Sequence, residues 1–245
     1  MKEQTFDVET SSGSMPVFVV HPETGGPFPL VVMLMDAGGI RDGLKDNARL
    51  LARDGYFVML PNLFHRSAGT GPIEDLHDMD RITQLNTGLN NADVVADVAA
   101  CAAFAAGHGA ATATNHFGLI GYCMGGRLGI TVAQALGDTV AAVVSLHPGY
   151  MATRSPASPH LFLNAIKARI YFGVAEHDEH LSPGQVARLE EALKENGIDY
   201  RLETLPGTHH GYAVPGRATY HPQGADHARA QVRALFGETL KATAP

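Results

Sequence analysis

One cysteine lies in a glycine pattern that suits a catalytic nucleophile. The segment GYCMG, residues 121–125, has the form G-x-C-x-G, a cysteine version of the G-x-S-x-G turn between a strand and a helix. Neighbours of the nucleophile crowd its backbone in that turn, so the positions two residues to either side must be small. Cys123 would lie at a helix N-terminus, where free N–H groups and the helix dipole favour the thiolate, the form that attacks a carbonyl carbon. The alternative interpretation is a small buried cysteine in a glycine-rich turn.

Carboxylates that could complete such a site follow a later apolar run. A nucleophile needs a base and the base needs an acid to orient it, and in α/β-hydrolases the acid precedes the histidine along the chain. After the run 168–175 come Glu176, Asp178 and Glu179. Asp178 is the preferred acid because it lies in the turn before a helix that opens at Ser182. The alternative is an ordinary solvated loop carboxylate.

Two adjacent histidines follow the next apolar run, in the order that an acid and a base require. His210 is preferred as the base over His209 because Gly211 lets the backbone bend, so that the imidazole can turn back over the thiol. His209 would then pack against a neighbour or face solvent.

Other residues are expected around this site. The N–H of Met124 would point at the oxyanion that develops during acyl transfer. Tyr122 precedes the thiol and His147 ends a later strand, so both are expected at the pocket rim, with a packing role as the alternative. Arg127 lies one helical turn beyond Cys123, and it is either the charge partner of a strand-end acid or a solvated helix residue.

The elements that must position these residues form an alternating pattern. Short apolar runs alternate with helical patterns, which is typical of βαβ units and a mostly parallel, doubly wound α/β sheet. An antiparallel strand pair begins this sheet, one domain is expected over residues 1–245, and residues 62–88 are interpreted as a long excursion. Catalytic residues should follow the carboxyl ends of strands. The expected strands cover 5–9, 15–22, 28–35, 56–64, 116–122, 140–150, 168–178 and 200–212, and the expected helices cover 46–55, 90–108, 124–137, 183–197 and 225–240.

The composition excludes several classes of protein. The chain has 245 residues, 45% of them hydrophobic, and a formal net charge of −7 with scattered lysines and arginines, so no nucleic-acid partner is expected. The N-terminus lacks the apolar core of a signal peptide, and no apolar run approaches the roughly 18 residues of a membrane span, so we expect a cytoplasmic protein with no membrane partner. Cys101 lies in an alanine-rich helical run and is expected in the core, which leaves two free thiols.

With these residues in place, the chain resembles the dienelactone hydrolase family, a branch of the α/β-hydrolases with a Cys-His-Asp triad. The resemblance covers nearly the whole chain. It rests on GYCMGG around Cys123, AEHDEHLSP around Asp178, HHGY around His210, and MLMDAGGIRDGL and GYFVMLPNLFHR near the N-terminus. It implies an α/β-hydrolase fold and a cofactor-independent, carboxymethylenebutenolidase-like hydrolase that binds no metal.

The resemblance also implies roles for residues outside the triad. Family members carry a carboxylate, usually Glu, that interacts with the resting thiol and is displaced by substrate, and the shorter Asp36 stands at that place, with a turn residue as the alternative. The N–H of Ala37 would be the second oxyanion donor. Arg81 matches an arginine that recognises a substrate carboxylate. Val214 stands where a second arginine is expected, and the nearest arginine is Arg217, so dienelactone itself is a weaker prediction.

Together these residues predict hydrolysis of a small, strained or activated ester or lactone through a thioacyl intermediate on Cys123. The partner would be that small molecule, and the chain would be a monomer or a homodimer. One alternative is a zinc site built from the thirteen histidines, although their spacings match no usual zinc motif. The other is a non-hydrolytic relative in which Cys123 is a redox-sensitive thiol.

Overall fold

The computed structural model describes residues 1–67, 73, 78–112 and 116–241. Residues 68–72 and 74–77 of the predicted excursion, and residues 242–245 of the predicted domain, lie outside the described residues. The strands are β1 Lys2–Thr10, β2 Gly13–His21, β3 Leu30–Leu34, β4 Phe57–Pro61, β5 Phe117–Tyr122, β6 Val140–Leu146, β7 Arg169–His177 and β8 Tyr200–His209. The helices are α1 Asp42–Arg53, α2 Met79–Thr87, α3 Asn91–Ala106, α4 Met124–Leu136, α5 Pro183–Glu195 and α6 Pro222–Phe236.

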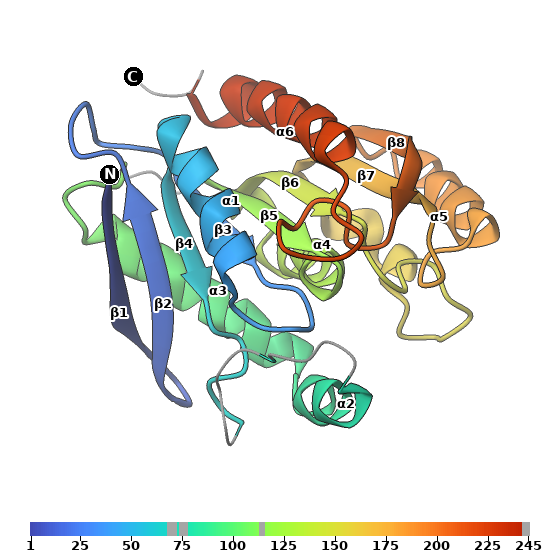
Figure 1. Cartoon of the computed structure of the whole chain (residues 1–245), viewed down its shortest axis with the longest axis horizontal. Coiled ribbons are helices and arrows are strands. Elements are labelled where there is room, and N and C mark those ends of the chain that lie inside the picture. The colour runs from blue at the N-terminus through green and yellow to red at the C-terminus, as the bar shows by residue number, and fades with distance from the viewer. Residues whose placement is uncertain (68–72, 74–77, 113–115, 242–245) are drawn as a thin grey trace.

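The strands form one sheet in the order β1-β2-β4-β3-β5-β6-β7-β8, shown in Figure 1. β1 and β2 pair antiparallel, β2 pairs antiparallel with β4, and the strands from β4 to β8 run parallel. The predicted doubly wound α/β sheet with an antiparallel N-terminal pair is therefore confirmed. Because the parallel strands share one direction, their carboxyl ends meet along one edge, where loops can form a site.

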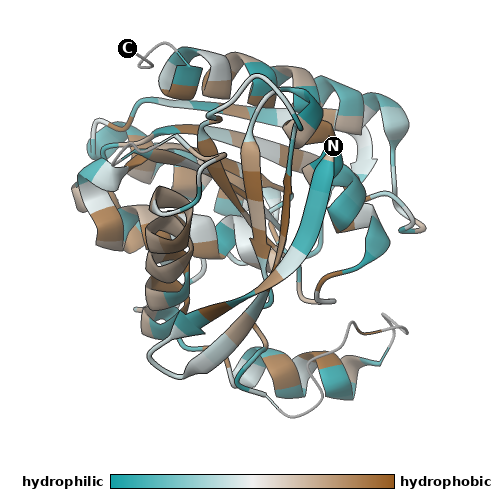
Figure 2. Cartoon of the chain, turned by 90° about the vertical axis from the view of Figure 1, so that its left-hand side faces the viewer, coloured by the Kyte–Doolittle hydropathy of each residue, from teal (hydrophilic) through white to brown (hydrophobic). Residues whose placement is uncertain are grey.

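Helices cover both faces of the sheet. α1 and α6 lie together on one face, whereas α3 and α4 pack against each other on the opposite face (Figure 1). β3, β4 and β5 are buried throughout, as strands enclosed by helices on both faces must be. Figure 2 shows these apolar strands in brown and the hydrophilic β1 in teal at the sheet edge. Cys101 on α3 is fully buried, as predicted.

Three helices differ from the predicted elements. α6 begins at Pro222, three residues before the predicted start, and ends at Phe236, and Gly237–Lys241 form a π-helix. α2 forms inside the predicted excursion, and it was missed because Leu85 is its one buried side chain, too little to give a periodic apolar pattern. Asp78 caps α2 by accepting a hydrogen bond from the N–H of Arg81. α1 begins four residues earlier than predicted, directly after Arg41, whose side chain caps nothing. This earlier start brings Arg41 to the end of β3.

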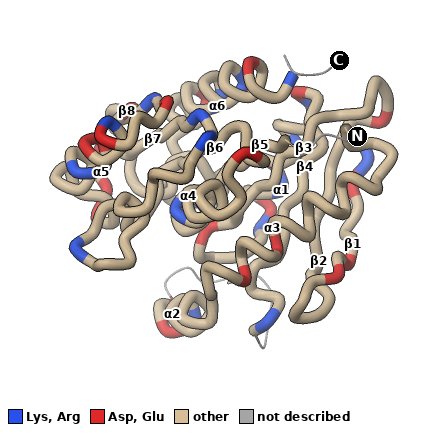
Figure 3. Tube along the Cα trace, turned by 180° about the vertical axis from the view of Figure 1, so that it is seen from behind, with Lys and Arg blue, Asp and Glu red and all other residues tan. Residues whose placement is uncertain are grey.

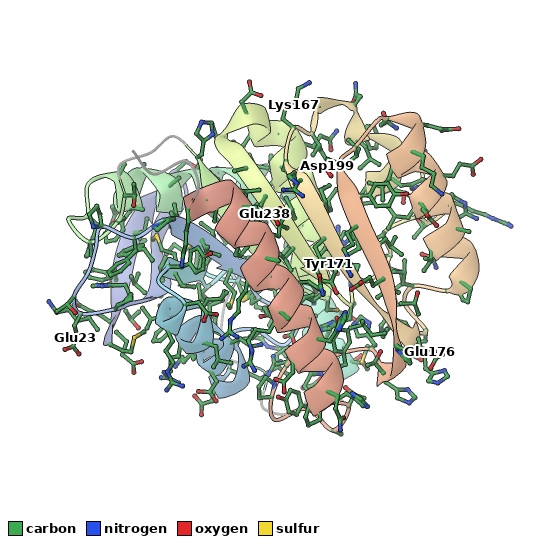
Figure 4. All side chains as sticks on the ribbon, turned by 90° about the horizontal axis from the view of Figure 1, so that it is seen from above. Glu23, Lys167, Tyr171, Glu176, Asp199 and Glu238 are labelled. Atoms are coloured by element: carbon green, nitrogen blue, oxygen red, sulfur yellow. The ribbon has the colours of Figure 1, made fainter. Side chains whose placement is uncertain are left out.

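Charged residues of both signs are spread over these elements. Figure 3 shows basic residues interspersed with acidic ones along the trace. In the part of the chain that the structure describes, no single helix is long and apolar enough to cross a membrane, and α2 with α3 passes that test only as a pair bent by 78°. Figure 4 shows the two ends of the parallel strands. Glu176 lies at the carboxyl end of β7, while Lys167 and Asp199 lie at the opposite end of the sheet.

Candidate active site

Cys123 occupies a strained turn between β5 and α4. Its φ of +52° lies in a region that residues with a Cβ rarely adopt, and its N–H donates to the carbonyl of Leu146 at 3.0 Å. A Cβ added to Gly121 would lie 2.1 Å from the carbonyl oxygen of Gly125, so a larger residue there would clash with backbone. The glycines flanking Cys123 are therefore a steric requirement of this turn, which presents the side chain at the carboxyl edge of the sheet.

His210 and Asp178 meet at the same edge. The Nδ1 of His210 lies 2.8 Å from Oδ2 of Asp178, and the other carboxylate oxygen accepts a hydrogen bond from the N–H of His180 at 2.8 Å. The Asp178 side chain is fully buried and that of His210 is 11% exposed. His209 instead is exposed, with its ring 5.0 Å from that of His177. The structure thus brings His210, and not His209, to the carboxylate.

A shift in the pairing register of β7 and β8 brings His210 level with Asp178. Ala175 pairs with Leu205 but His177 pairs with His209, so β8 holds two more residues than β7 between these pairs. Gly207, with a φ of +70°, allows the bulge, and its N–H donates to a carboxylate oxygen of Glu176 at 2.7 Å. The extra length advances the chain so that the residue after β8 is level with the residue after β7.

The environment of His210 favours its charged form. Burial alone would lower the pKa of His210, but the hydrogen bond with Asp178 and the neighbouring Cys123 raise the pKa to about 10. Its Nε2 is buried and has no hydrogen-bond partner among the described residues. A base whose Nδ1 is fixed by a carboxylate and whose Nε2 is free can exchange a proton with a thiol or a substrate.

Gly211 turns the chain directly after this histidine. Its φ is +91°, and an added Cβ would lie 2.7 Å from Nε of Arg217 and 2.9 Å from Oγ1 of Thr219. The hydroxyl of Thr219 donates to the carbonyl of His210 at 2.8 Å. The loop after β8 therefore folds back over the site, and it carries Arg217 there.

The two predicted oxyanion donors lie on segments that touch. Met124 is the first residue of α4, so its N–H has no intrahelical acceptor. A Cβ on Gly125 would lie 2.3 Å from the carbonyl oxygen of Leu34 and 2.6 Å from that of Met35, so α4 begins directly against the end of β3. Ala37 follows two residues later on that segment. Both N–H groups thus come from the contact between α4 and the end of β3.

Asp36 is completely surrounded by donors. Its side chain is fully buried, with Oδ1 accepting from the N–H of Gly38 at 2.9 Å and Nη1 of Arg41 at 2.8 Å. Oδ2 accepts from Nη2 of Arg41 at 2.7 Å and Nη1 of Arg217 at 2.9 Å. Burial would raise the pKa of Asp36, but these two guanidinium groups and the Gly38 N–H lower it overall. Its hydrogen bonds in the described structure go to these three residues and none to Cys123.

Sequence reasoning missed these arginine contacts. Arg41 stands five residues after Asp36 in the quoted motif MLMDAGGIRDGL, which was a local signal for an ion pair. Arg217 lies 181 residues from Asp36 along the chain and reaches it only because the loop after β8 packs on the start of α1, where a Cβ on Gly43 would lie 2.0 Å from the carbonyl oxygen of Pro215. No sequence pattern indicates that contact.

Tyr122 and His147 lie behind the site and not on its rim. Their relative exposures are 3% and 0%. Tyr122 lines a small cavity between α1 and α6, while the ring of His147 lies 5.2 Å from that of His210 and 5.3 Å from that of Tyr212. Burial and the charges of His210 and Arg217 hold the pKa of His147 well below its usual value. The expected position at the rim is wrong because Tyr122 faces the cavity between α1 and α6, and His147 is buried against His210 and Tyr212.

The two remaining arginines differ in their surroundings. Arg81 lies on α2, where its Nη1 donates to Gln84 at 2.8 Å, and its role in substrate binding stays a prediction. Arg127 lies on α4, partly buried, and its backbone N–H donates to the carbonyl of Cys123 at 3.2 Å. Its guanidinium forms no ion pair or hydrogen bond with any described residue, so the structure shows no acid partner for it, and the solvated helix residue stays a prediction.

Nothing in the described part of the chain outlines a metal centre. No three His, Cys, Asp or Glu side chains there are arranged to hold a metal ion. A cleft of about 860 Å3 lies at the opposite edge of the sheet, lined by His21, Phe28 and His108 among others, and contains no residue of the Cys123 cluster.

The fold, with a strained turn after β5 and an acid and histidine after the last two strands, defines the class of protein as an α/β-hydrolase. A sequence profile of the dienelactone hydrolase family matches residues 15–240. The chain belongs to the dienelactone hydrolase family, as the sequence resemblance predicted.

Individual relatives are more distant. A protein from Methylorubrum extorquens named "Putative carboxymethylenebutenolidase" is 26% identical over 221 residues, which cover 89% of this chain and 75% of the relative. A protein from Bradyrhizobium sp. named "Probable 2-oxo-3-(5-oxofuran-2-ylidene)propanoate lactonase" is 25% identical over 224 residues, covering 91% of this chain and 88% of the relative. The crystal structure of a "Putative Dienelactone Hydrolase" from Klebsiella pneumoniae has a TM-score of 0.88 at 23% identity, covering 97% of this chain and 98% of the other. That structure shares the fold.

Proposed function

We propose that the chain hydrolyses small carboxylic esters or lactones without a cofactor, with Cys123 as nucleophile, His210 as base and Asp178 as the acid that orients the base. The observation that carries this proposal is the 2.8 Å contact between His210 Nδ1 and Asp178, at the strand edge where Cys123 occupies its strained turn. The names of the two relatives, a carboxymethylenebutenolidase and a lactonase, support a lactone as the substrate class.

The first half of the reaction would acylate the enzyme. His210 holds the proton of the Cys123 thiol on Nε2, and Sγ attacks the carbonyl carbon, which pushes the electron pair of the C=O bond onto oxygen. The N–H groups of Met124 and Ala37 hold that oxyanion. Collapse of the intermediate breaks the C–O ester bond, and the leaving alkoxide takes the proton from Nε2. For a lactone, the released alcohol stays attached to the acyl group.

The second half would release the acid. A water molecule gives its proton to Nε2 of His210 as its oxygen attacks the thioester carbonyl carbon. The C–S bond breaks, Sγ leaves as the thiolate, and the imidazolium again lies beside it. Asp178 keeps its charge throughout and holds Nδ1–H toward itself, so that Nε2 always faces the reacting atoms.

Replacement of the nucleophile tests this proposal. With p-nitrophenyl acetate and dihydrocoumarin as substrates, Cys123→Ala should lower kcat by at least about 1,000-fold, since removal of a triad member usually costs that much or more. The control is Cys101→Ala, which removes a fully buried thiol on α3 and should leave kcat unchanged. Hydrolysis at the wild-type rate by Cys123→Ala would refute the cysteine mechanism, and the redox-sensitive thiol would become the better hypothesis.

A cytoplasmic location and a monomeric or homodimeric state stay predictions.

A further inference from the structure

Two further histidine rings pack against the ring of the proposed base. The ring of His180 lies 4.6 Å from that of His210 at an interplanar angle of 82°, and the ring of His147 lies 5.2 Å from it at 70°. Near-perpendicular arrangements at such separations are favourable contacts between aromatic rings. Asp178 holds His210 through one hydrogen bond at Nδ1, which leaves the ring able to tilt about that bond. The two ring contacts oppose that tilt.

His180 contacts the acid as well as the base. Its backbone N–H donates to Oδ1 of Asp178 at 2.8 Å, the oxygen that His210 does not use. Burial and the charge of His210 lower the pKa of His180, which favours a neutral ring beside the charged base. His180 therefore lies against both members of the pair without adding a second positive charge.

The loop after β6 holds the His180 ring in place. The hydroxyl of Tyr150 lies 3.0 Å from Nδ1 of His180, and the N–H of Tyr150 donates to the carbonyl of His180 at 2.9 Å. A Cβ added to Gly149 would lie 3.5 Å from Cβ of His180 and 4.0 Å from Cε1 of His210, so this loop runs beside both rings. These contacts join the loop after β6 to the loop after β7.

The backbone of the loop after β6 is strained at two positions. His147 has a φ of +37° and Tyr150 a φ of +59°, and together with Cys123 they are the non-glycine residues with positive φ in the described part of the chain. Such conformations persist only where the surrounding structure holds them, and they cluster at functional sites. The strained loop thus places one ring against His210 and one hydroxyl against His180.

We propose that His180 is a positioning residue that fixes the imidazole of His210 toward Cys123 by ring packing. A misplacement of about 1 Å in a catalytic site can lower a rate by about 100-fold, and packing against a fixed neighbour restricts such movement. The inference rests on the proposed function in taking His210 as the base. It assigns His180 no contact with the substrate, so it predicts a change in kcat and not in KM.

Substitutions of the His180 side chain test the inference, because all of them keep the backbone N–H that binds Asp178. His180→Ala removes the ring and should lower kcat for p-nitrophenyl acetate by about 10- to 100-fold, with KM within about 2-fold of the wild-type value. His180→Phe keeps a ring beside His210 and should retain most of kcat. His180→Gln keeps a polar partner for Tyr150 but no ring, and should be as slow as His180→Ala.

The matched control is His177→Ala. It removes one ring of an exposed histidine pair, His177 and His209, that lies at the ends of the same two strands with a ring separation of 5.0 Å. This variant should leave kcat unchanged. Circular dichroism shows whether each variant folds, and His180→Gln serves as the ringless variant if His180→Ala does not. A rise in KM at constant kcat in the ringless variants would overturn the inference.

A readout without substrate separates this inference from the proposed function. The proton on Nδ1 of His210 gives a low-field signal in the proton NMR spectrum while the ring is held against Asp178, and exchange with water broadens it. The signal should be sharp in wild type and His180→Phe, and broad in the two ringless variants. An unchanged signal in those variants would overturn the inference, and ester hydrolysis by the same protein would leave the proposed function standing. The predicted signals in a chain that hydrolyses no ester would uphold the inference and refute the proposed function.

Discussion

Asp178 and Asp36 are two carboxylates with the same burial and opposite surroundings. Both side chains are fully buried, and each follows the carboxyl end of a strand, β7 or β3. Asp178 faces one ionisable partner, His210, whose charge depends on a proton. Asp36 faces two guanidinium groups, whose charge is permanent.

The difference teaches what each carboxylate can do. A buried carboxylate beside a histidine makes the histidine a stronger base and fixes its tautomer, so its charge acts on the reacting atoms. A buried carboxylate between two arginines satisfies all its hydrogen bonds within a closed cluster and joins β3, the start of α1 and the loop after β8. We therefore expect substitutions of Asp178 to affect catalysis most and substitutions of Asp36 to affect mainly stability.

The largest effect is expected for Asp178→Asn. The amide has the size of the carboxylate but lets Nδ1 of His210 lose its proton, which puts the wrong nitrogen toward the thiol. We predict that kcat for p-nitrophenyl acetate falls by about 10,000-fold, as for the equivalent change in other triads. Stability should also fall at pH values where the pair with Asp178 keeps His210 charged. A kcat within about 10-fold of the wild-type value would contradict the comparison.

Asp36→Asn should act on stability. The substitution leaves Arg41 and Arg217, whose side chains are 17% and 23% exposed, without a counter-charge. Breaking a buried ion pair costs about 3–5 kcal/mol, and the partial exposure of the arginines reduces this to about 2–4 kcal/mol. Urea unfolding measures the change, with Arg233→Met, which breaks a surface pair with Asp54, as the control. An unchanged midpoint for Asp36→Asn would show that the arginine cluster does not contribute to stability.

The pH dependence of stability should separate the two regions. The pKa of His210 in the folded chain, about 10, lies above its ordinary value of 6.5, so its contribution is complete below pH 6.5 and is lost as pH rises through 10. The pKa of Asp36 lies below its ordinary value of 3.8, so its contribution is complete above that pH and is lost as pH falls further.

Two differences in the free energy of unfolding measure this. The difference between wild type and His210→Gln should shrink between pH 6.5 and 10 by at most about 1.4 kcal/mol per pH unit. The difference between wild type and Asp36→Asn should stay constant over that range. If both differences changed in parallel between pH 6.5 and 10, the contributions of His210 and Asp36 would not be independent.

The smallest effect is expected for Arg217→Met. Asp36 then keeps both hydrogen bonds to Arg41 and the one from Gly38, so about 1–2 kcal/mol of stability should be lost, less than for Asp36→Asn. Arg233→Met, at a surface pair with Asp54, is the control and should cost less than about 1 kcal/mol. A loss of stability for Arg217→Met as large as that for Asp36→Asn would contradict the conclusion that two arginines share the binding of Asp36.

Local patterns in the sequence predicted the parts of the site that depend on neighbouring residues. The spacing of glycines around Cys123 predicted the turn, because the clash that requires Gly121 involves the next few residues of the same turn. The alternating runs predicted the sheet and the strand ends that carry Asp178 and His210. Membership of the family followed from these same segments.

Contacts between distant segments could not be predicted in this way. The bulge that aligns His210 with Asp178 depends on the pairing of β7 with β8, and the contact of Arg217 with Asp36 depends on how a loop packs on α1. The inward direction of Tyr122 and His147 was missed because a strand end alone does not determine which way a side chain points. α2 was missed because one buried residue leaves no pattern.

The central claim is that Cys123 becomes acylated. Rapid acid quenching of the wild-type enzyme during turnover of p-nitrophenyl acetate, followed by peptide mass spectrometry, tests it most directly, with His210→Gln as a second sample because loss of the base should slow release of the acyl group. The account predicts one acetyl group on the peptide that contains Cys123 and none on the peptide that contains Cys101. Turnover with no acyl group on Cys123 in either sample, or with the acyl group on another residue, would contradict it.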